Sequence, residues 1–205
     1  FVAPDDPLAA GMVDALEAAG IRAFGPRKNA AVIESSKVFS KDLMKKYGIP
    51  TAGYEVFDDP QKAVDYIVEQ NKFPVVVKAD GLALGKGVVI CQNLNEAKDA
   101  VHSIMEDKIF GASGNQVVIE EFITGPEVSV LSFTDGKTVK PMVSSKDTSV
   151  PMMVIRIKYR RNGDHQPEPS LQRRDADQCM KEIFQPTIDA MQKREGPFRA
   201  VCISV

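Results

Sequence analysis

The chain has 205 residues, 43% of them hydrophobic, which suits one ordinary domain or two small ones with a real core. Its 26 Lys and Arg residues against 28 Asp and Glu residues give a formal net charge of −2, which argues against a protein that grips nucleic acid or anionic lipid through its overall charge. No stretch approaches the roughly 20 apolar residues of a membrane-spanning helix. Three cysteines without a CxxC pair and two separated histidines argue against a disulfide framework or a Cys/His zinc site, so we expect a soluble, cytoplasmic protein.

The first 50 residues predict a helix, a short strand and a second helix. Apolar residues recur at helical spacing over residues 7–20, and the apolar run at 21–24 is a strand candidate that ends at a Gly-Pro breaker. The second helix is predicted over about 36–47, with Ser35 or Ser36 as its N-cap. A proline shortly after this helix prevents its continuation, and we expect a domain boundary there.

From residue 51 onward the pattern is typical of a mixed α/β domain. The predicted elements are, in order, a strand at 54–57, a helix at 59–70, strands at 73–78 and 88–91, a helix capped by Asn95, and a strand at 116–122. The stretches 127–133 and 138–143 flank an Asp-Gly turn and predict a β-hairpin. The apolar residues of 147–178 follow neither the helical nor the strand periodicity. An amphipathic helix is predicted over 179–191 despite an internal proline.

The stretch 74–90 is the most informative part of the sequence. An apolar strand ends at Lys78, a loop with three glycines and Lys86 follows, and a second strand begins. Glycines let backbone N–H groups approach a phosphate without hindrance from Cβ, and two ammonium groups can neutralise a polyphosphate. The spacing G-x-x-x-G-K-G and the strand that follows exclude a Walker A loop. The alternative is an ordinary hairpin with solvated lysines.

A second candidate is the strand that ends in Glu120 and Glu121 and is followed, after a turn, by Glu127. An exposed strand edge after a nucleotide loop can offer backbone N–H and C=O groups to adenine, and a carboxylate beyond it can accept hydrogen bonds from both ribose hydroxyls. The alternative is a solvated strand end, which this segment taken by itself favours.

Together these segments resemble the ATP-grasp superfamily and, within it, the glycinamide ribonucleotide synthetase (phosphoribosylamine–glycine ligase) family of purine biosynthesis. The resemblance is continuous over 1–147 and resumes at about 179–187. The matching stretches are Ala3-Pro4-Asp5-Asp6-Pro7-Leu8, Phe24-Gly25-Pro26, Glu34-Ser35-Ser36-Lys37, Lys41-Asp42, Gly48-Ile49-Pro50-Thr51-Ala52, the loop from Lys78 to Ile90, Ile119-Glu120-Glu121-Phe122 and Gly125-Pro126-Glu127.

The resemblance implies a partial ATP-grasp fold of mixed α/β class, preceded by the tail of a Rossmann-like domain. Residues 1–50 would belong to that preceding domain, 51–122 to the small lobe with the glycine-rich phosphate loop, and 123–205 to the start of the large lobe.

The resemblance also implies a set of site residues. Lys37 and Lys78 would bind the ATP phosphates, and the loop around them would fold over the triphosphate. The loop residues are Gly81, Gly85, Lys86 and Gly87; the adenine hinge would be Glu120, Glu121, Phe122 and Ile123; Glu127 would bind ribose; Asp5 and Asp147 are further candidates for substrate contact. No residue is assigned as catalytic.

The implied reaction joins glycine to 5-phosphoribosylamine while ATP is cleaved to ADP and phosphate, through a glycyl phosphate. Mg²⁺ or Mn²⁺ would bridge the phosphate oxygens, with its Glu and Asn ligands outside this chain. The implied partners are therefore small-molecule substrates, with no nucleic acid and no membrane, and we expect a monomer.

The sequence departs from the family's pattern at its ends and after Asp147. The family's early glycine loop and its metal ligands are absent, so we expect a central fragment of a longer protein that is inactive by itself. The family continues after that aspartate with H-K-R-x-x-D-x-D-x-G-x-N-T-G-G-M-G, and codons compatible with residues 147–155 can encode such a motif in another frame. We therefore expect a reading-frame slip over 148–178 and again within 194–205, the alternative being a divergent insertion.

Two other functions remain open. One is another ATP-grasp carboxylate–amine ligase, against which the turn at residues 5–8 and the lysine-glycine loop argue. The other is a non-catalytic nucleotide-binding or interaction module, in which the basic stretch 156–174 contacts an acidic partner or RNA. Its basic residues lack interleaved aromatics apart from Tyr159, which argues against base stacking.

Overall fold

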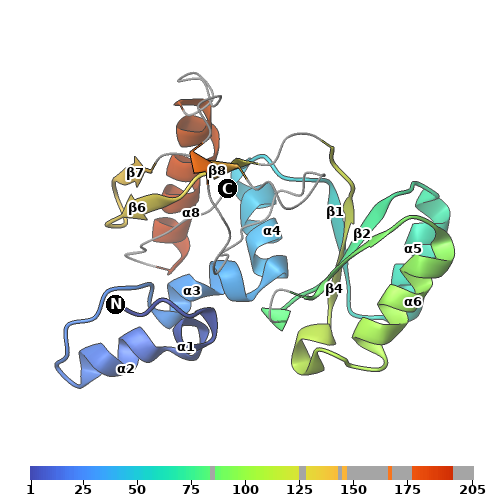
Figure 1. Ribbon diagram of the computed structural model, residues 1–205, viewed down its shortest axis with the longest axis horizontal. Helices are drawn as coiled ribbons and strands as arrows, with labels where there is room; N and C mark the ends of the chain where they lie inside the picture. Colours follow the sequence, from blue (N-terminus) through green and yellow to red (C-terminus); the bar gives the residue numbers. More distant parts are fainter. Residues whose placement is uncertain (84–85, 125–127, 143–144, 147–165, 168–176, 196–205) are drawn as a thin grey trace. The chain divides into compact units, whose positions relative to one another are not determined.

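The computed structural model describes residues 1–83, 86–124, 128–142, 145–146, 166–167 and 177–195 (Figure 1). These residues form two compact units. The first contains residues 1–32, 42–51 and the described residues from 124 onward, and the second contains 33–41 and 52–123. The second unit holds the lysine-glycine loop and most of the predicted site.

The second unit is built on a four-stranded sheet in the order β1-β4-β2-β3, with every neighbouring pair antiparallel. The strands are β1 (Tyr54–Phe57), β2 (Val75–Ala79), β3 (Val88–Cys91) and β4 (Val117–Glu121), and the helices are α5 (Pro60–Gln70), α6 (Leu94–Met105) and the short 3₁₀ helix η2 (Gly111–Gly114). All four strands and both long helices were predicted from the sequence, and their positions are confirmed to within a few residues.

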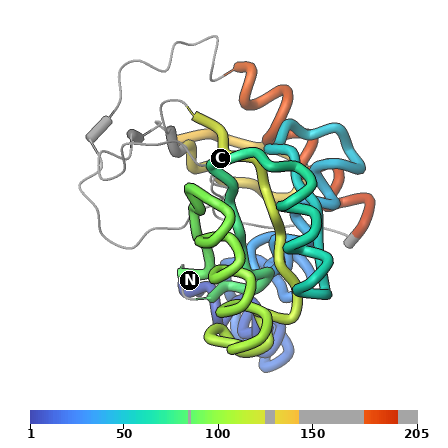
Figure 2. The backbone as a smooth tube through the Cα atoms, turned by 90° about the vertical axis from the view of Figure 1, so that its right-hand side faces the viewer, coloured from blue at the N-terminus to red at the C-terminus, as the bar shows by residue number. Residues whose placement is uncertain are grey.

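Helices α5 and α6 lie side by side on one face of this sheet (Figure 2). Successive side chains of a strand point to opposite faces, so every second residue of β2 and β4 meets these helices. The strand residues in the resulting core are Val75, Val77, Ala79, Val117 and Ile119. The alternate residues, Lys78 and Glu120 among them, therefore share the opposite face of the sheet.

The two helices begin at side-chain caps. Asp59 accepts a hydrogen bond from the backbone N–H of Lys62 at 2.9 Å, and Pro60 occupies the first turn, where its missing N–H is not needed. The predicted cap of the next helix was wrong by two residues. Asn93, in extended backbone conformation, accepts from the N–H of Glu96 at 3.1 Å, and the Glu96 carboxylate accepts from the N–H of Gln92, which completes a reciprocal cap.

The amino-terminal part of the first unit differs from the sequence prediction at two points. The single helix expected over 7–20 is two helices, α1 (Asp5–Ala10) and α2 (Met12–Ala18), because Gly11 between them adopts a φ of +96°. The strand expected at 21–24 is not formed in the described part of the chain. Val2 donates one backbone hydrogen bond to the Phe24 carbonyl at 3.0 Å, and one such bond does not make a ladder.

Helices α3 (Lys28–Ser35) and α4 (Lys37–Tyr47) each contribute residues to both units. Helix α4 confirms the predicted helix over 36–47, whereas α3 was not predicted. Ser36 is the N-cap of α4, since its hydroxyl accepts a hydrogen bond from the backbone N–H of Phe39 at 3.0 Å.

The remaining strands of the first unit are short. They are β5 (Val128–Ser129), β6 (Ser132–Thr134), β7 (Val139–Pro141), β8 (Ser145–Lys146) and β9 (Gln166–Pro167), with β8 paired to both β5 and β9. The predicted hairpin is confirmed as the antiparallel pair β6–β7. Asp135 closes its turn by accepting from the backbone N–H groups of Lys137 and Thr138, which hold the pKa of the Asp135 carboxyl below its usual value.

The last described segment confirms the predicted helix over 179–191 and explains how it tolerates a proline. A π-helical turn, η3 (Met180–Phe184), leads directly into α8 (Gln185–Glu195). Pro186 has no N–H, and its ring would clash with the carbonyl four residues earlier in a regular α-helix; the wider turn before it relieves this conflict. The buried residues Phe184, Ile188 and Met191 anchor the helix.

Candidate functional site

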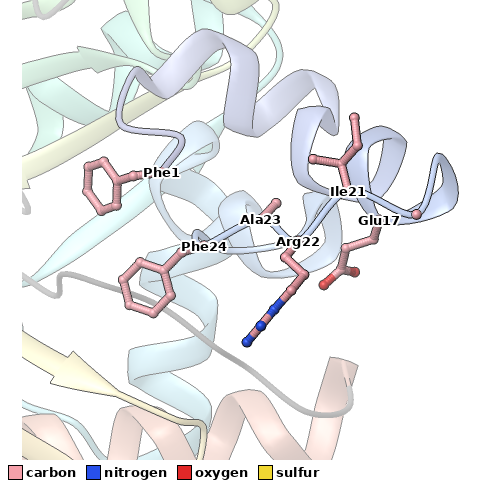
Figure 3. Close-up of a pocket in the computed structure, with 7 residues that line it drawn as sticks. Phe1, Glu17, Ile21, Arg22, Ala23 and Phe24 are labelled. Atoms are coloured by element: carbon pink, nitrogen blue, oxygen red, sulfur yellow. The ribbon is translucent and has the colours of Figure 1, made fainter.

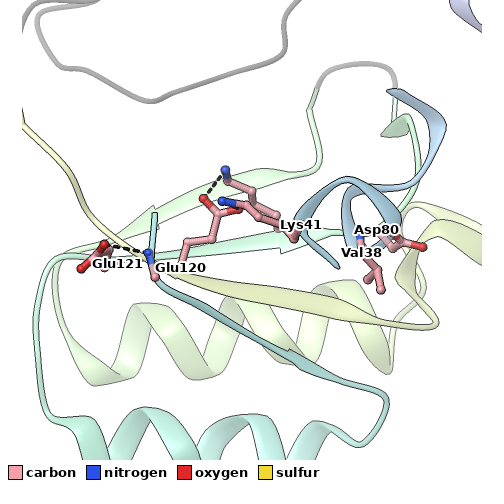
Figure 4. A network of polar contacts seen from close by, with 7 residues as sticks. Val38, Lys41, Asp80, Glu120 and Glu121 are labelled. Atoms are coloured by element: carbon pink, nitrogen blue, oxygen red, sulfur yellow. Dashed lines mark hydrogen bonds and ion pairs between the residues drawn. The ribbon is translucent and has the colours of Figure 1, made fainter. Parts of the chain in front are cut away.

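Three charged side chains are buried together on the face of the sheet that α5 and α6 leave uncovered (Figure 4). The Lys78 Nζ donates to Glu120 Oε2 at 2.6 Å, and the Lys41 Nζ lies 3.2 Å from Glu120 Oε1. Their side chains are nearly inaccessible to solvent, with 5% of Lys78, 4% of Glu120 and 7% of Lys41 exposed. Two ammonium groups thus share one buried carboxylate.

The strand register explains how Lys78 meets Glu120. Lys78 is opposite Val118 across the β2–β4 ladder, so Glu120 is its diagonal neighbour on the same face. The simple hairpin interpretation of this loop is therefore half right. Strands β2 and β3 do form an antiparallel pair, but Lys78 is buried and paired rather than solvated, whereas Lys86 is exposed.

The position of β4 corrects two expectations about the paired carboxylates. This strand lies between β1 and β2, so Glu120 and Glu121 are not on an exposed strand edge. The solvated-end interpretation is also wrong for Glu120, although Glu121 is exposed. Phe122 and Ile123, both half-buried, follow the last residue of the ladder.

Burial changes the acid–base behaviour of Lys41. Removal from water lowers the pKa of its ammonium group below the ordinary value of 10.5. The Glu120 carboxylate opposes this shift, and the positive charge of Lys78 adds to it. The Lys41 ammonium also lies 5.5 Å from the centre of the Tyr54 ring, a cation–π contact from β1.

The start of α4 is tied to the end of β2 by Asp80. One Asp80 carboxylate oxygen accepts from the Val38 N–H at 2.8 Å and from the Ser36 hydroxyl at 3.0 Å, and the Asp80 carbonyl accepts from the Lys37 N–H at 3.0 Å. The Lys37 Nζ donates to the Gly81 carbonyl at 2.6 Å. Since residues four apart lie on one face of a helix, the same turns of α4 direct Lys37 toward the loop and Lys41 toward Glu120.

Sequence reasoning proposed no role for Lys41 or Asp80. The spacing of Lys37 and Lys41 on a predicted helix was a usable signal, because it places two ammonium groups on one face. The position of Asp80, directly after the strand that carries Lys78, was a weaker signal for a site residue. Its hydrogen-bond partners at the start of α4 lie more than 40 residues earlier in the chain.

The loop glycines have packing reasons to lack a side chain. A Cβ at Gly81 would lie 2.0 Å from the Ser113 hydroxyl of η2, and one at Gly87 would lie 2.6 Å from the Ala83 Cβ. The Asp80 N–H donates to the Ser113 carbonyl at 3.0 Å, which fixes the start of the loop on η2. Gly85 lies outside the described residues.

We expect Gly81→Ala to lower the free energy of unfolding by about 1–3 kcal/mol, because the added methyl group overlaps the Ser113 side chain. Chemical denaturation followed by circular dichroism measures the loss. Adding Ser113→Gly should recover most of it, with Ser113→Gly alone as the control. An equal loss from Gly81→Ala in both backgrounds would show that this contact is not the cause.

The other site residues predicted from the sequence do not all lie beside the buried cluster of Lys41, Lys78 and Glu120. Glu121 accepts a hydrogen bond from the Gly53 N–H at 2.7 Å and donates its own N–H to the Gly53 carbonyl, which closes the end of the sheet. Asp5 is in the first turn of α1 in the first unit. Glu127 and Asp147 lie outside the described residues.

An open pocket of about 580 Å³ lies in the first unit (Figure 3). Its lining residues are Phe1, Glu17, Gly20, Ile21, Arg22, Ala23 and Phe24, and none of them is a predicted site residue. No group of three His, Cys, Asp or Glu side chains able to hold a metal ion occurs within the described ranges. Burial raises the pKa of the Cys91 thiol to about 11, which favours the protonated thiol over the nucleophilic thiolate at neutral pH.

Residues 35–204 match the family model described as "Phosphoribosylglycinamide synthetase, ATP-grasp (A) domain", and residues 1–34 match the N domain of the same enzyme. The chain belongs to the phosphoribosylglycinamide synthetase family. The family resemblance found in the sequence is thereby confirmed, and the mixed helix-and-sheet structure is part of an ATP-grasp fold.

Individual relatives of this family agree. The phosphoribosylamine–glycine ligase of Archaeoglobus fulgidus is 48% identical over 147 residues, which cover 72% of this chain and 31% of that protein. The Haemophilus influenzae enzyme of the same name is 42% identical over 192 residues, covering 93% of this chain and 44% of that protein. The crystal structure of the Thermotoga maritima ligase superposes with a TM-score of 0.71 at 29% identity, covering 86% of this chain and 45% of that chain. The chain therefore spans less than half the length of these relatives.

Proposed function

We propose that the chain provides the nucleotide-phosphate site of a phosphoribosylamine–glycine ligase, which joins glycine to 5-phosphoribosylamine in purine biosynthesis as ATP is cleaved to ADP and phosphate. The observation that best supports this is the lysine arrangement of the second unit, within the family-matched residues. Lys78 and Lys41 are buried around Glu120, and Lys37 contacts the first glycine of the loop. Such an arrangement suits a polyanionic ligand because it concentrates positive charge beside a glycine-rich backbone.

The chemistry needs positioning and neutralisation of charge more than a protein nucleophile. A glycine carboxylate oxygen attacks the γ-phosphorus of ATP, the bond to the β-phosphate oxygen breaks, and ADP leaves. The amine of phosphoribosylamine then attacks the acyl carbon and expels phosphate. In this proposal Lys37, Lys78 and the loop hold the phosphates, residues 120–123 form the adenine hinge, and Glu127 binds ribose.

ATP-grasp ligases use a divalent metal together with ATP, and Mg²⁺ or Mn²⁺ would supply charge neutralisation at the phosphates. Within the described ranges there is no group of three His, Cys, Asp or Glu side chains that could hold such an ion. As the family resemblance implies, we propose that its Glu and Asn ligands lie outside these residues, and we route no step through them.

The proposed domain roles follow the same assignment. Residues 1–50 would end the preceding Rossmann-like domain, 51–122 would form the small lobe, and 123–205 would begin the large lobe. None of the helices in the described part of the chain is both long and apolar enough to cross a membrane. We propose a monomeric, cytoplasmic enzyme with small-molecule partners.

A chimera tests the ligase assignment directly. Residues 1–147 would replace the matching stretch of the Haemophilus influenzae ligase, and turnover with ATP, glycine and phosphoribosylamine would be measured. We expect an active chimera that loses activity on Lys78→Ala. A chimera that folds and binds ATP but does not turn over would favour the nucleotide-binding module instead.

The 205-residue chain by itself is expected to show no ligase turnover when Mg²⁺, glycine and phosphoribosylamine are supplied. It spans less than half of its relatives, and its residues 148–178, nearly all outside the described ranges, lack the family's H-K-R to G-G-M-G segment. Loss of positioning alone can raise a barrier by up to about 7–11 kcal/mol. Robust turnover by a protein whose mass confirms these 205 residues would contradict this expectation. Peptide masses across 148–178 test the frame slip separately, since they should fit His-Lys-Arg rather than Thr-Ser-Val if the slip is real.

Glu127→Gln is expected to weaken ATP binding by about 10- to 100-fold and to leave the affinity for inorganic triphosphate nearly unchanged. The carboxylate is proposed to accept from the ribose hydroxyls, and an amide offers one acceptor fewer; a charge-assisted hydrogen bond contributes about 1.5–3 kcal/mol. Calorimetric titration with both ligands makes the comparison. Equal losses for both would indicate a general electrostatic effect.

A further inference from the structure

Asp80 joins three segments of the second unit (Figure 4). Its carboxylate accepts hydrogen bonds from the Val38 N–H at 2.8 Å and from the Ser36 hydroxyl at 3.0 Å, at the start of α4. Its backbone N–H donates to the carbonyls of Ser113 and Gln116, at 3.0 and 3.2 Å. The end of β2 is therefore fixed both to the first turn of α4 and to the segment that connects η2 with β4.

This junction connects the two lysines that are proposed to bind the ligand phosphates. Lys37 is the first residue of α4, and Lys78 is two residues before Asp80 on β2. The Lys37 backbone N–H donates to the Asp80 carbonyl at 3.0 Å, and the Lys37 Nζ donates to the Gly81 carbonyl at 2.6 Å. The position of Lys37 relative to Lys78 thus depends on Asp80 and on the residue that follows it.

Fixing that position favours a polyphosphate for a physical reason. Such a ligand gains from both ammonium groups only when their separation matches that of the phosphate oxygens. A lysine side chain is long and flexible, so holding its backbone in place reduces the entropy that is lost on binding. The negative charge of Asp80 acts in the opposite sense, because by itself it would repel a phosphate.

We propose that Asp80 is a positioning residue that places Lys37 for contact with the ligand phosphates, and that it acts through the geometry of its hydrogen bonds rather than through its charge. The inference rests on the proposed phosphate-binding role of Lys37 and Lys78. In this proposal Asp80 itself does not contact the nucleotide.

The experiment is a calorimetric titration of the 205-residue chain with ATP, inorganic triphosphate and adenosine. Asp80→Ala should weaken binding of both phosphate ligands by about 3- to 10-fold, the range expected when one long side chain must be ordered on binding, and leave adenosine binding unchanged. Asp80→Asn keeps an oxygen that can accept from Val38 and Ser36, so it should bind triphosphate at least as tightly as the unmodified chain. A role through charge predicts instead that both variants bind triphosphate more tightly.

Double variants show whether Asp80 acts through Lys37. In a Lys37→Met background, Asp80→Ala should have less than about a twofold further effect on triphosphate binding, because the side chain that Asp80 places is gone. In a Lys86→Met background, which removes the exposed lysine of the glycine loop, Asp80→Ala should weaken binding as much as in the unmodified chain. A purely structural role for Asp80 predicts the same loss in both backgrounds.

Two further variants separate positioning from loss of stability. Asp80→Glu keeps the charge but moves the carboxylate by one methylene group, so it should also weaken triphosphate binding; it replaces Asp80→Ala in every comparison if that variant does not fold. Asn93→Ala removes the cap of α6, which follows β3 at the end of the sheet where Cys91 pairs with Val75, the β2 residue farthest from Asp80. This control should lower the unfolding temperature without changing the affinity for triphosphate.

Four outcomes overturn the inference: undiminished triphosphate binding by Asp80→Ala and Asp80→Glu, a loss from Asp80→Asn as large as that from Asp80→Ala, an equal loss from Asp80→Ala with and without Lys37, or no binding of either phosphate ligand by the unmodified chain. Failure of the proposed function gives a different pattern. The unmodified chain would then bind triphosphate in a way that depends on Lys37 and Asp80 but would bind ATP no more tightly, and the positioning role would stand. Thermal unfolding curves for each variant identify any loss that comes from unfolding.

Discussion

Glu120→Gln is expected to lower the free energy of unfolding by about 3–5 kcal/mol, the largest stability effect that we predict. The substitution removes the negative charge between Lys41 and Lys78 and leaves two buried ammonium groups facing each other. Chemical denaturation followed by circular dichroism measures the change.

The neighbouring residue supplies a matched control. Glu121→Gln makes the same chemical change one position along β4, at an exposed side chain whose contact with the Gly53 N–H an amide oxygen can replace. We expect a loss below about 1 kcal/mol. Similar losses from the two variants would mean that the buried cluster contributes nothing special to stability.

Lys78→Ala is expected to weaken ATP binding by about 10- to 100-fold, and Lys86→Ala to weaken it much less. Lys78 extends from a rigid strand and is already held by Glu120, so little side-chain entropy is lost when a phosphate binds. Lys86 is exposed on the glycine loop and must be ordered on binding. Calorimetric titration of the two variants ranks them.

Two results would oppose this ranking. Equal losses would indicate that both lysines act only through general electrostatic attraction, and a larger loss from Lys86→Ala would make the loop the main phosphate contact. Raising the salt concentration separates these cases, because screening reduces the contribution of an exposed ammonium more than that of a buried one.

The sequence predicted the sheet and the long helices well because their patterns are local. The apolar run of β2, the apolar pattern of α5 and the Asp-Gly turn of the β6–β7 hairpin each specify a structure within a few residues. The break between α1 and α2 was missed because a glycine inside an apolar helical pattern is compatible with either outcome until its φ is known.

The candidate site was predicted only in part, since its contacts join distant segments. Lys78 was singled out because a lysine that ends an apolar strand needs a partner. Its partner and the third member of the cluster were not predicted, because Glu120 is 42 residues away and Lys41 lies on a helix outside the sheet. The strand order was also needed to show that Glu120 is interior rather than on an edge.

The hydrogen bonds that Asp80 accepts from the first turn of α4 allow movement of the loop to be followed by hydrogen exchange. The amide hydrogens of Lys37 and Val38 are at the first turn of α4, where they have no acceptor within the helix, and both are bonded to Asp80. Their exchange with solvent deuterium therefore depends on whether the end of β2 keeps its place. These two amides should act as built-in reporters, slow to exchange while the loop start is anchored and fast whenever it detaches.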